Sequence, residues 1–266
     1  LQAMTAAAAT LAALLLLASF GPGLLAGDVA TARLQWVLAA GLNANFFLDP
    51  LGLFFAGLIL GIGLLIIIYA RFYLAAEDSM GRFYIFLLLF QGAMLGITLS
   101  DNVLLLIVFW ELTSLSSFLL IGYWRHKPEA RQGARMALVV TGGGGLALLA
   151  GLLLLAQIAG SADLTTILAS RDVVQASPWY PLALILILIG CFTKSAQFPF
   201  HFWLPHAMAA PTPVSAYLHS ATMVKTGVFL LARLWPVLAG TDWWFYLVAT
   251  TGLVTMVIGA AIALFK

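Results

Sequence analysis

Charged residues are scarce in this chain of 266 residues. Asp, Glu, Lys and Arg make up 8% of it, against about 25% in soluble domains, which excludes a soluble globular protein. Twelve Lys and Arg against ten Asp and Glu leave a net charge of +2, too small to indicate nucleic-acid binding. Because Cys191 is the single cysteine, no intrachain disulfide can form. Metal, nucleotide and haem motifs are also missing from the sequence, so we expect no cofactor and no resident metal.

The sequence is instead dominated by long apolar runs. Runs of about 20 apolar residues are typical of transmembrane helices, and the sequence contains about eight. A cleaved signal peptide is the alternative for the first run, but no Lys or Arg precedes Arg33 to form a positive n-region. We therefore expect an all-α integral membrane protein in which residues 1–266 form a single transmembrane domain. The predicted helices are roughly Ala3–Ala26, Leu51–Tyr73, Phe83–Leu99, Val103–Tyr123, Met136–Ile158, the run from Trp179, the run that holds Lys225, and Trp243–Phe265.

The segments between these runs are more polar. Ala32–Ala40 predicts a short interfacial helix, and Leu164–Ser170 predicts a short helix within a polar loop. Gly142–Gly145 lacks the lysine and the strand context of a phosphate loop, so it predicts close helix packing. Basic residues gather in Arg71–Arg82 and Trp124–Arg135, which eight spans place on the same side of the membrane. By the basic-residue bias of cytoplasmic loops, we expect that side to be cytoplasmic.

In the stretch Trp179–Leu234, a long apolar run is followed by four prolines and three histidines between Lys194 and Lys225. Pro199 and Pro205 follow Lys194 closely, and proline removes a backbone donor and breaks the helical turn behind it. Such breaks are tolerated at membrane depth only where the freed backbone groups are buried in protein or face water. We therefore expect a discontinuous helix, interrupted between about Ser195 and Pro205, with Lys194 near its break.

Three ionisable residues, Glu111, Lys194 and Lys225, lie inside apolar runs. Ionisable groups at membrane depth cost about 2.5–3.5 kcal/mol on insertion scales, so they indicate a pathway for ions or protons. Two alternatives are structural. Glu111 could be a packing carboxyl satisfied by the hydroxyls of Thr113 or Ser114, and the lysines could extend to an interface.

The run that holds Lys225 also carries a polar face. A regular helix places four of its polar residues on one side, at i, i+4, i+7 and i+11, with Lys225 beside them. Such a face can line a hydrated path, and the alternative is hydrogen bonding between helices. His201 lies in the expected break, where it could shuttle protons or be an interfacial residue. The four residues of the polar face are Ser215, His219, Thr222 and Thr226.

Three stretches of the sequence resemble a known family. Lys194–Pro205 (KSAQFPFHFWLP) and Ala210–Lys225 (APTPVSAYLHSATMVK) are similar to the proton-conducting antiporter-like membrane subunits. That superfamily includes the large membrane subunits of respiratory complex I and the Mrp-type multisubunit Na+/H+ antiporters. Phe109–Trp124 (FWELTSLSSFLLIGYW) looks most like the large A subunit of the Mrp antiporters. Complex I subunits usually have glycines where this chain has Leu112–Ser114, and often lack a lysine at the position of Lys225.

The resemblance covers nearly the whole chain from about Phe47 on and assigns roles to these residues. It implies that Glu111 pairs with Lys194 of the broken helix. It places Lys225 further along the same hydrophilic axis, and His201 matches a histidine implicated in that axis. It also implies an N-terminal half-channel whose core repeat spans about residues 83–235, with a second broken helix outside this sequence.

The function implied by the resemblance is that of an ion transporter subunit rather than an enzyme. The chain would belong to a multisubunit monovalent cation/proton antiporter of the bacterial inner membrane that couples Na+ efflux to H+ entry, with K+ or Li+ as alternative cations. Other antiporter subunits and the lipid bilayer would be its partners. One alternative is a proton-pumping membrane subunit of a complex I-like NADH-quinone oxidoreductase or a membrane hydrogenase. Another is a structural membrane scaffold. Lys225 and the Leu112–Ser114 sequence favour the antiporter.

Overall fold

The computed structural model describes residues 1–37, 42–75 and 77–265. Across these residues, seven helical stretches are long and apolar enough to span a membrane, and the shorter apolar helix Tyr180–Lys194 begins an eighth span. The all-α membrane fold is therefore confirmed. The helices are α1 (Gln2–Ser19), α2 (Gly21–Leu25), α3 (Pro50–Tyr73), α4 (Met80–Leu99), α5 (Val103–Ile121), α6 (Pro128–Ala159), α7 (Leu164–Ala169), α8 (Arg171–Ala176), α9 (Tyr180–Lys194), η2 (Phe200–Phe202), α10 (Trp203–Ala207), α11 (Thr212–Ser215), η3 (Ala216–Ala221), α12 (Met223–Leu238) and α13 (Asp242–Leu264).

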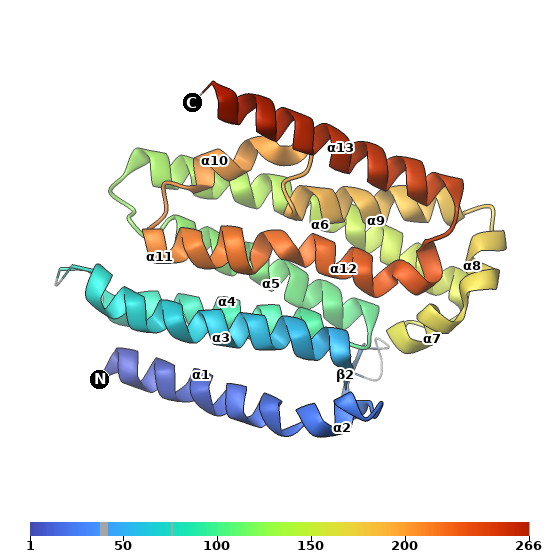
Figure 1. The fold of residues 1–266 in the computed structure, drawn as a ribbon, viewed down its shortest axis with the longest axis horizontal. Helices are drawn as coiled ribbons and strands as arrows, with labels where there is room; N and C mark the ends of the chain where they lie inside the picture. Colours follow the sequence, from blue (N-terminus) through green and yellow to red (C-terminus); the bar gives the residue numbers. More distant parts are fainter. Residues whose placement is uncertain (38–41, 76, 266) are drawn as a thin grey trace.

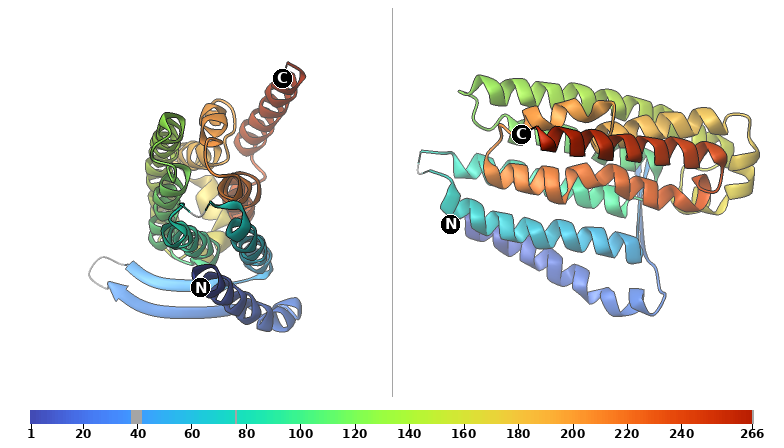
Figure 2. Two further views of the ribbon diagram at one scale, coloured as in Figure 1. Left: turned by 90° about the vertical axis from the view of Figure 1, so that its left-hand side faces the viewer. Right: turned by 45° about the horizontal axis from the view of Figure 1, so that its top comes forward.

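The long helices lie side by side along the longest axis of the molecule (Figure 1). The connections from α3 to α4 and from α5 to α6 lie at one end of the bundle, and α7 and α8 lie at the other. Helix α6 packs against both α5 and α9, and α12 packs against α9. Helix α13 stands away from the rest (Figure 2), and Trp244 is its one buried residue.

Local sequence signals set several helix ends. Asp49 caps α3 by accepting a hydrogen bond of 2.8 Å from the Gly52 amide, and Asn102 caps α5 in the same way. Helix α6 ends at Ala159 and is followed by Gly160, whose φ of 72° is the left-handed conformation that glycine adopts without steric cost. The expected helices therefore begin and end close to their predicted positions where a capping residue is present.

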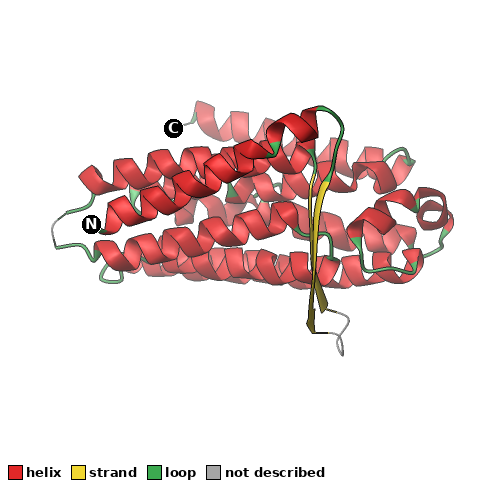
Figure 3. Ribbon diagram, turned by 90° about the horizontal axis from the view of Figure 1, so that it is seen from below, coloured by secondary structure: helices red, strands yellow, loops and turns green. Residues whose placement is uncertain are grey.

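The segment before α3 forms a β-hairpin. Strands β1 (Ala30–Val37) and β2 (Leu42–Leu48) pair antiparallel, and the hairpin runs across the helices and projects beyond them (Figure 3). The predicted interfacial helix Ala32–Ala40 is wrong over residues 32–37, and its residues 38–40 lie outside the described residues. The Asp101 amide donates a hydrogen bond of 2.8 Å to the Asn45 carbonyl, so long-range backbone pairing fixes this segment as strand.

Helix α6 is longer than the sequence suggested. It begins at Pro128 rather than Met136, and it takes in much of the segment expected to be a basic loop. Proline at the first position and Glu129 in the first turn favour a helix start. The short helix expected at Leu164–Ser170 is present as α7, and α8 follows it directly.

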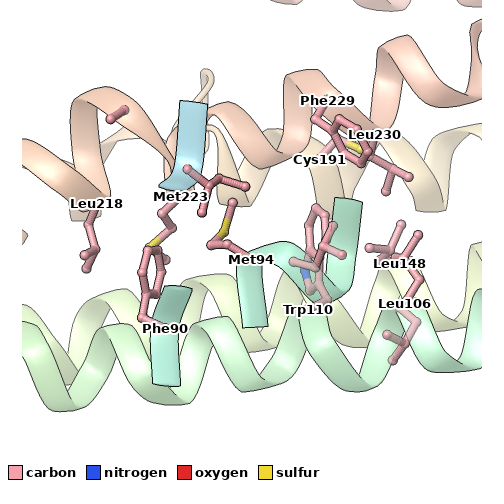
Figure 4. Packing of buried hydrophobic residues seen from close by; sticks show 14 of the residues in the cluster. Phe90, Met94, Leu106, Trp110, Leu148, Cys191, Leu218, Met223, Phe229 and Leu230 are labelled. Carbon is pink, nitrogen blue, oxygen red and sulfur yellow. The ribbon is translucent and has the colours of Figure 1, made fainter. Parts of the chain in front are cut away.

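The core lies between α4, α5, α6, α9 and α12. Phe90 and Met94 of α4, Trp110 of α5, and Met223 and Phe229 of α12 point into it (Figure 4), and all five are buried. Lipid tails are as apolar as these side chains, so close packing rather than water exclusion holds such helices together. Close packing in turn fixes the position of every polar group that the core encloses.

Candidate functional site

Lys194 is the last residue of α9, and its side chain is completely buried. Its ammonium group donates one hydrogen bond of 2.7 Å to the Ser114 hydroxyl and one of 3.1 Å to the Trp110 carbonyl, both on α5. The Nζ atom also lies 5.2 Å from the centre of the Trp110 ring, a distance at which the ring face attracts a cation. A buried lysine is therefore held by neutral oxygen acceptors and an aromatic ring.

Glu111 follows Trp110 on α5 and is half-buried. Its Oε1 atom is buried and has no hydrogen-bond partner among the described residues. Within that part of the chain, no nitrogen–oxygen distance between Glu111 and Lys194 is as short as 4.0 Å. The structure thus brings the predicted partners to adjacent positions on α5 and α9, but the ion pair between them is open.

Two glycines of α6 fix the position of this pair. A methyl group at Gly145 would overlap the Oε1 atom of Glu111, and one at Gly144 would overlap the hydroxyl of Thr193, the neighbour of Lys194. The close packing predicted for Gly142–Gly145 is confirmed at these two positions. Its consequence was not foreseen: the absent side chains leave the space that the carboxylate occupies.

A short chain of hydroxyl groups continues from Lys194. The Ser114 hydroxyl, which accepts from Lys194, lies 3.4 Å from the hydroxyl of Thr141 on α6. Thr141 also donates to the Ala137 carbonyl at 2.8 Å. Sequence reasoning considered Ser114 only as a partner of Glu111, and it missed Thr141. The available signal was the i+3 position of Ser114, which lies on the same helix face as Glu111.

The break after α9 is built from protein hydrogen bonds. The Trp203 indole donates to the Thr193 carbonyl at 2.9 Å, and the Ser195 hydroxyl donates to the Val224 carbonyl at 2.7 Å. The Phe198 amide donates to the hydroxyl of Thr255 on α13 at 2.9 Å. The predicted interruption between Ser195 and Pro205 is confirmed. Several polar groups at the break are thus satisfied within the protein, as membrane burial requires.

His201 lies within this break, on η2. It is half-buried, and its Nδ1 atom is buried without a partner among the described residues. Its ring stacks on that of Phe198, with 5.9 Å between centres. The structure therefore places His201 at the break, as predicted, and its role in a proton path stays a prediction.

The predicted polar face of the next helix is divided by a π-helical turn. The turn η3 replaces regular α-helical geometry between residues 216 and 221, so the assumed i, i+4, i+7 and i+11 spacing of a regular helix does not hold across it. Thr222 donates to the Tyr217 carbonyl at 2.7 Å, and Thr226 donates to the Thr222 carbonyl at 3.3 Å. Both threonine hydroxyls thus satisfy local backbone groups.

Ser215 and His219 are different, because they keep unpartnered polar atoms. The Ser215 hydroxyl and both ring nitrogens of His219 are buried without hydrogen bonds in the described part of the chain. The His219 ring contacts Trp203 edge-on, with 6.1 Å between ring centres. Since the Trp203 indole also binds the Thr193 carbonyl next to Lys194, Trp203 connects His219 to the lysine site.

Lys225 does not join this group. Its side chain is exposed on the outside of the bundle, and among the described residues it has neither an ion pair nor a side-chain hydrogen bond. It nevertheless lies in a helical stretch, Thr212–Leu238, that is long and apolar enough to span a membrane. The structure therefore places Lys194 against Trp110 and His219 against Trp203, with His201 in the break beside them in sequence, and it leaves Lys225 exposed.

Comparisons with known proteins cover nearly the whole chain. Residues 100–266 match the family described as "NADH:quinone oxidoreductase/Mrp antiporter, TM". Residues 36–84 match the one described as "NADH-Ubiquinone oxidoreductase (complex I), chain 5 N-terminus". The A/B subunit of a probable K(+)/H(+) antiporter from Rhizobium meliloti is 54% identical over 98% of this chain and 26% of its own length. The A subunit of the Na(+)/H(+) antiporter from Alkalihalophilus pseudofirmus is 51% identical over 89% of this chain and 30% of its own.

A solved structure shows the same fold. A chain of the Mrp complex from Dietzia sp. DQ12-45-1b superposes with a TM-score of 0.84 at 42% sequence identity. The match covers 88% of this chain and 26% of that one. The sequence described here thus spans between a quarter and a third of the length of the relatives it matches.

Proposed function

Because the chain belongs to the NADH:quinone oxidoreductase/Mrp antiporter transmembrane family, we propose that it is part of a membrane subunit of a multisubunit monovalent cation/proton antiporter. In this proposal it conducts protons and helps to couple Na+ efflux to H+ entry across a bacterial inner membrane. The observation that carries the proposal is the state of Lys194, which is completely buried and bound to neutral oxygens. The carboxylate of Glu111 lies beside it and forms no ion pair with the described residues.

The open pair supplies a switch for proton affinity. When Glu111 approaches Lys194, its negative charge favours the protonated lysine; when they separate, only the neutral acceptors remain. At an effective dielectric of about 20, a pair about 4 Å apart interacts by roughly 4 kcal/mol. That corresponds to about a thousandfold change in proton affinity. Opening and closing the pair can therefore make Lys194 alternately take up and release a proton.

The surroundings supply acceptors for the released proton. His219 and His201 each have at least one buried ring nitrogen without a partner in the described residues, and the unprotonated nitrogen of a neutral imidazole can accept a proton. Trp203 contacts His219 and binds the backbone beside Lys194. We propose that protons pass between Lys194 and His219 near Trp203, and that Ser215 lines this path.

The exposed position of Lys225 bears on the protein surfaces that surround this chain. An ammonium facing lipid tails would be unfavourable by several kcal/mol, and intramembrane charges almost always face protein or water. Since Lys225 is exposed on an apolar helix, we propose that other parts of the complete subunit or its partner subunits cover it. The proton path would continue there from this half-channel.

Transport in everted membrane vesicles that contain the complete antiporter complex tests the proposal. A proton gradient is formed by ATP hydrolysis without NADH, and Na+ or K+ is then added. Wild type should dissipate the gradient, whereas Glu111→Gln and Lys194→Ala should not. Near-normal exchange in both variants at normal abundance of the complex would contradict the assignment. A need for NADH would instead favour the alternative, a proton-pumping subunit of a complex I-like assembly.

A further inference from the structure

A pocket of about 450 Å³ opens between the end of α5 and the start of α6. Three arginines line it: Arg125, Arg131 and Arg135. The remaining lining is apolar and includes Phe118 and Leu119 of α5. We call it the arginine pocket. None of its residues belongs to the site around Lys194.

The positive charge of the arginine pocket is not neutralised by the protein. Among the described residues, none of the three guanidinium groups forms an ion pair with a carboxylate, and Glu129 in the first turn of α6 does not pair with them either. Within the described part of the chain, the one hydrogen bond donated by these groups joins Arg135 Nε to the Arg131 carbonyl at 3.3 Å. Like charges at i and i+4 on a helix repel each other. The pocket is therefore suited to an anion.

The position of the pocket along α6 indicates which kind of anion it would bind. Helix α6 has 32 residues and is about 48 Å long at 1.5 Å per residue, whereas the hydrocarbon core of a bilayer is about 30 Å thick. The first turns of α6, with Arg131 and Arg135, therefore reach the headgroup region. Phe118 and Leu119 lie just inside the end of the span α5, which is at Ile121. They are therefore at the depth where acyl chains begin.

From this geometry we propose that the arginine pocket binds the headgroup of an anionic phospholipid. The guanidinium groups would hold the phosphate, since their planar forks bind phosphate oxygens with two parallel hydrogen bonds. The apolar wall formed by Phe118 and Leu119 would contact the upper acyl chain. Basic pockets between transmembrane helices are suited to such lipids. The inference does not depend on which ion the complex transports.

Native mass spectrometry of the intact complex tests this inference. The complex is reconstituted in nanodiscs of phosphatidylglycerol and phosphatidylcholine, released into detergent, and the retained lipids are counted. Wild type should retain phosphatidylglycerol in preference to phosphatidylcholine. Each of Arg125→Gln, Arg131→Gln and Arg135→Gln should weaken retention about fivefold, as expected for one basic residue near an anionic surface. Arg→Lys variants at the same positions should retain most of it.

Arg71→Gln is the matched control, because Arg71 is an exposed arginine in the last turn of α3 and does not line the pocket. It should retain phosphatidylglycerol like wild type. Equal retention by wild type and the triple glutamine variant would overturn the inference. So would displacement of the lipid by inorganic phosphate, which would show a site for the free ion. Loss of a partner protein from the triple variant with unchanged lipid would show a protein occupant and would also overturn it.

Discussion

The ammonium group of Lys194 donates its shortest hydrogen bond, 2.7 Å, to the hydroxyl of Ser114. Ser114 lies one helical turn after Glu111, so the hydroxyl and the carboxylate belong to the same face of α5. The two groups can therefore exchange roles as the partner of one lysine. The neutral partner is bound in this structure, and the charged one forms no ion pair with Lys194 among the described residues.

Lys194→Arg should abolish antiport while the complex still assembles. Arginine keeps the positive charge, and so preserves the attraction to Glu111, but it does not release its proton at any accessible pH. The two measurements are antiport in everted vesicles and the abundance of the protein by immunoblotting. Near-normal antiport at normal abundance would leave Lys194 with a purely structural role.

Ser114→Ala should reduce antiport and lower the stability of the complex by about 2 kcal/mol, within the range of hydrogen bonds to charged groups. The lysine would lose its shortest bond and keep only the Trp110 carbonyl. Ser117→Ala is the matched control, since the Ser117 hydroxyl donates only to the Ser114 carbonyl of its own helix. If the two variants transport and unfold alike, the neutral acceptor is unimportant.

Gly145→Ala should impair transport by roughly tenfold to hundredfold, the scale of effect expected when a reacting group is misplaced by about 1 Å. The added methyl group would overlap the Glu111 carboxylate and displace it. Gly143→Ala adds the same methyl group where no atom lies within 4 Å. That control should transport normally, and its helix should be slightly stabilised. Equal activity in both variants would show that the carboxylate tolerates displacement.

Asp49→Asn should destabilise the complex by about 3–5 kcal/mol, because it leaves the buried guanidinium of Arg233 without its counter-ion. The Arg233 guanidinium binds Asp49 through two hydrogen bonds of 2.6 Å and 2.9 Å. Thermal unfolding of the purified complex is the measurement. A methyl group added at Gly52 would lie 3.4 Å from Arg233 Nη2, so Gly52→Ala is a milder perturbation of the same contact. A stability of Asp49→Asn equal to wild type would refute the importance of this pair.

The same pair predicts a pH dependence. Burial raises the pKa of the Asp49 carboxyl, but the hydrogen bond and charge of Arg233 outweigh it, and the net pKa lies below the ordinary value of 3.8. A lowered pKa means that the folded state binds protons less readily than the unfolded state. The contribution of Asp49 is therefore complete above about pH 4 and is lost as the pH falls through the folded pKa. Asp49→Asn should remove this part of the acid sensitivity from the unfolding profile.

A cysteine introduced at Pro128 should be inaccessible to membrane-impermeant reagents outside intact cells. The end of the bundle that holds Arg125, Lys127, Arg131 and Arg135 is richer in basic residues, which predicts a cytoplasmic position. The native thiol of Cys191 is buried and should give little background. Labelling of this cysteine from outside the cells would contradict the predicted orientation.

The spans and the break could be predicted from the sequence because both follow from local chemistry. Apolar runs of the right length have few alternatives to helices in a membrane, and prolines after Lys194 predicted the end of α9. The hairpin could not be predicted, because Ala30–Val37 is stabilised as a strand by pairing with Leu42–Leu48. Strand formation depends on such contacts more than on local preference.

The residues of the site were easier to predict than their arrangement. Glu111 and Lys194 were identifiable as buried charges, but the role of Ser114 depends on how α5 and α9 are packed. Lys225, which is exposed, comes after the π-helical turn η3 in the chain. In that turn the Thr222 hydroxyl donates to the carbonyl of Tyr217, five residues earlier. A regular helix was assumed there, and nothing in the spacing of the polar residues indicated the extra residue.

The shortness of α9 has an electrical consequence. Its 15 residues extend about 22 Å at 1.5 Å per residue, less than the roughly 30 Å of a hydrocarbon core. A helix that begins at one membrane surface therefore leaves Lys194 within the core. Moving one elementary charge across the whole membrane changes its energy by about 2.3 kcal/mol per 100 mV. In the proposed mechanism, a proton arriving at Lys194 would cross part of that voltage, so membrane potential, as well as pH, would set how often this lysine is charged.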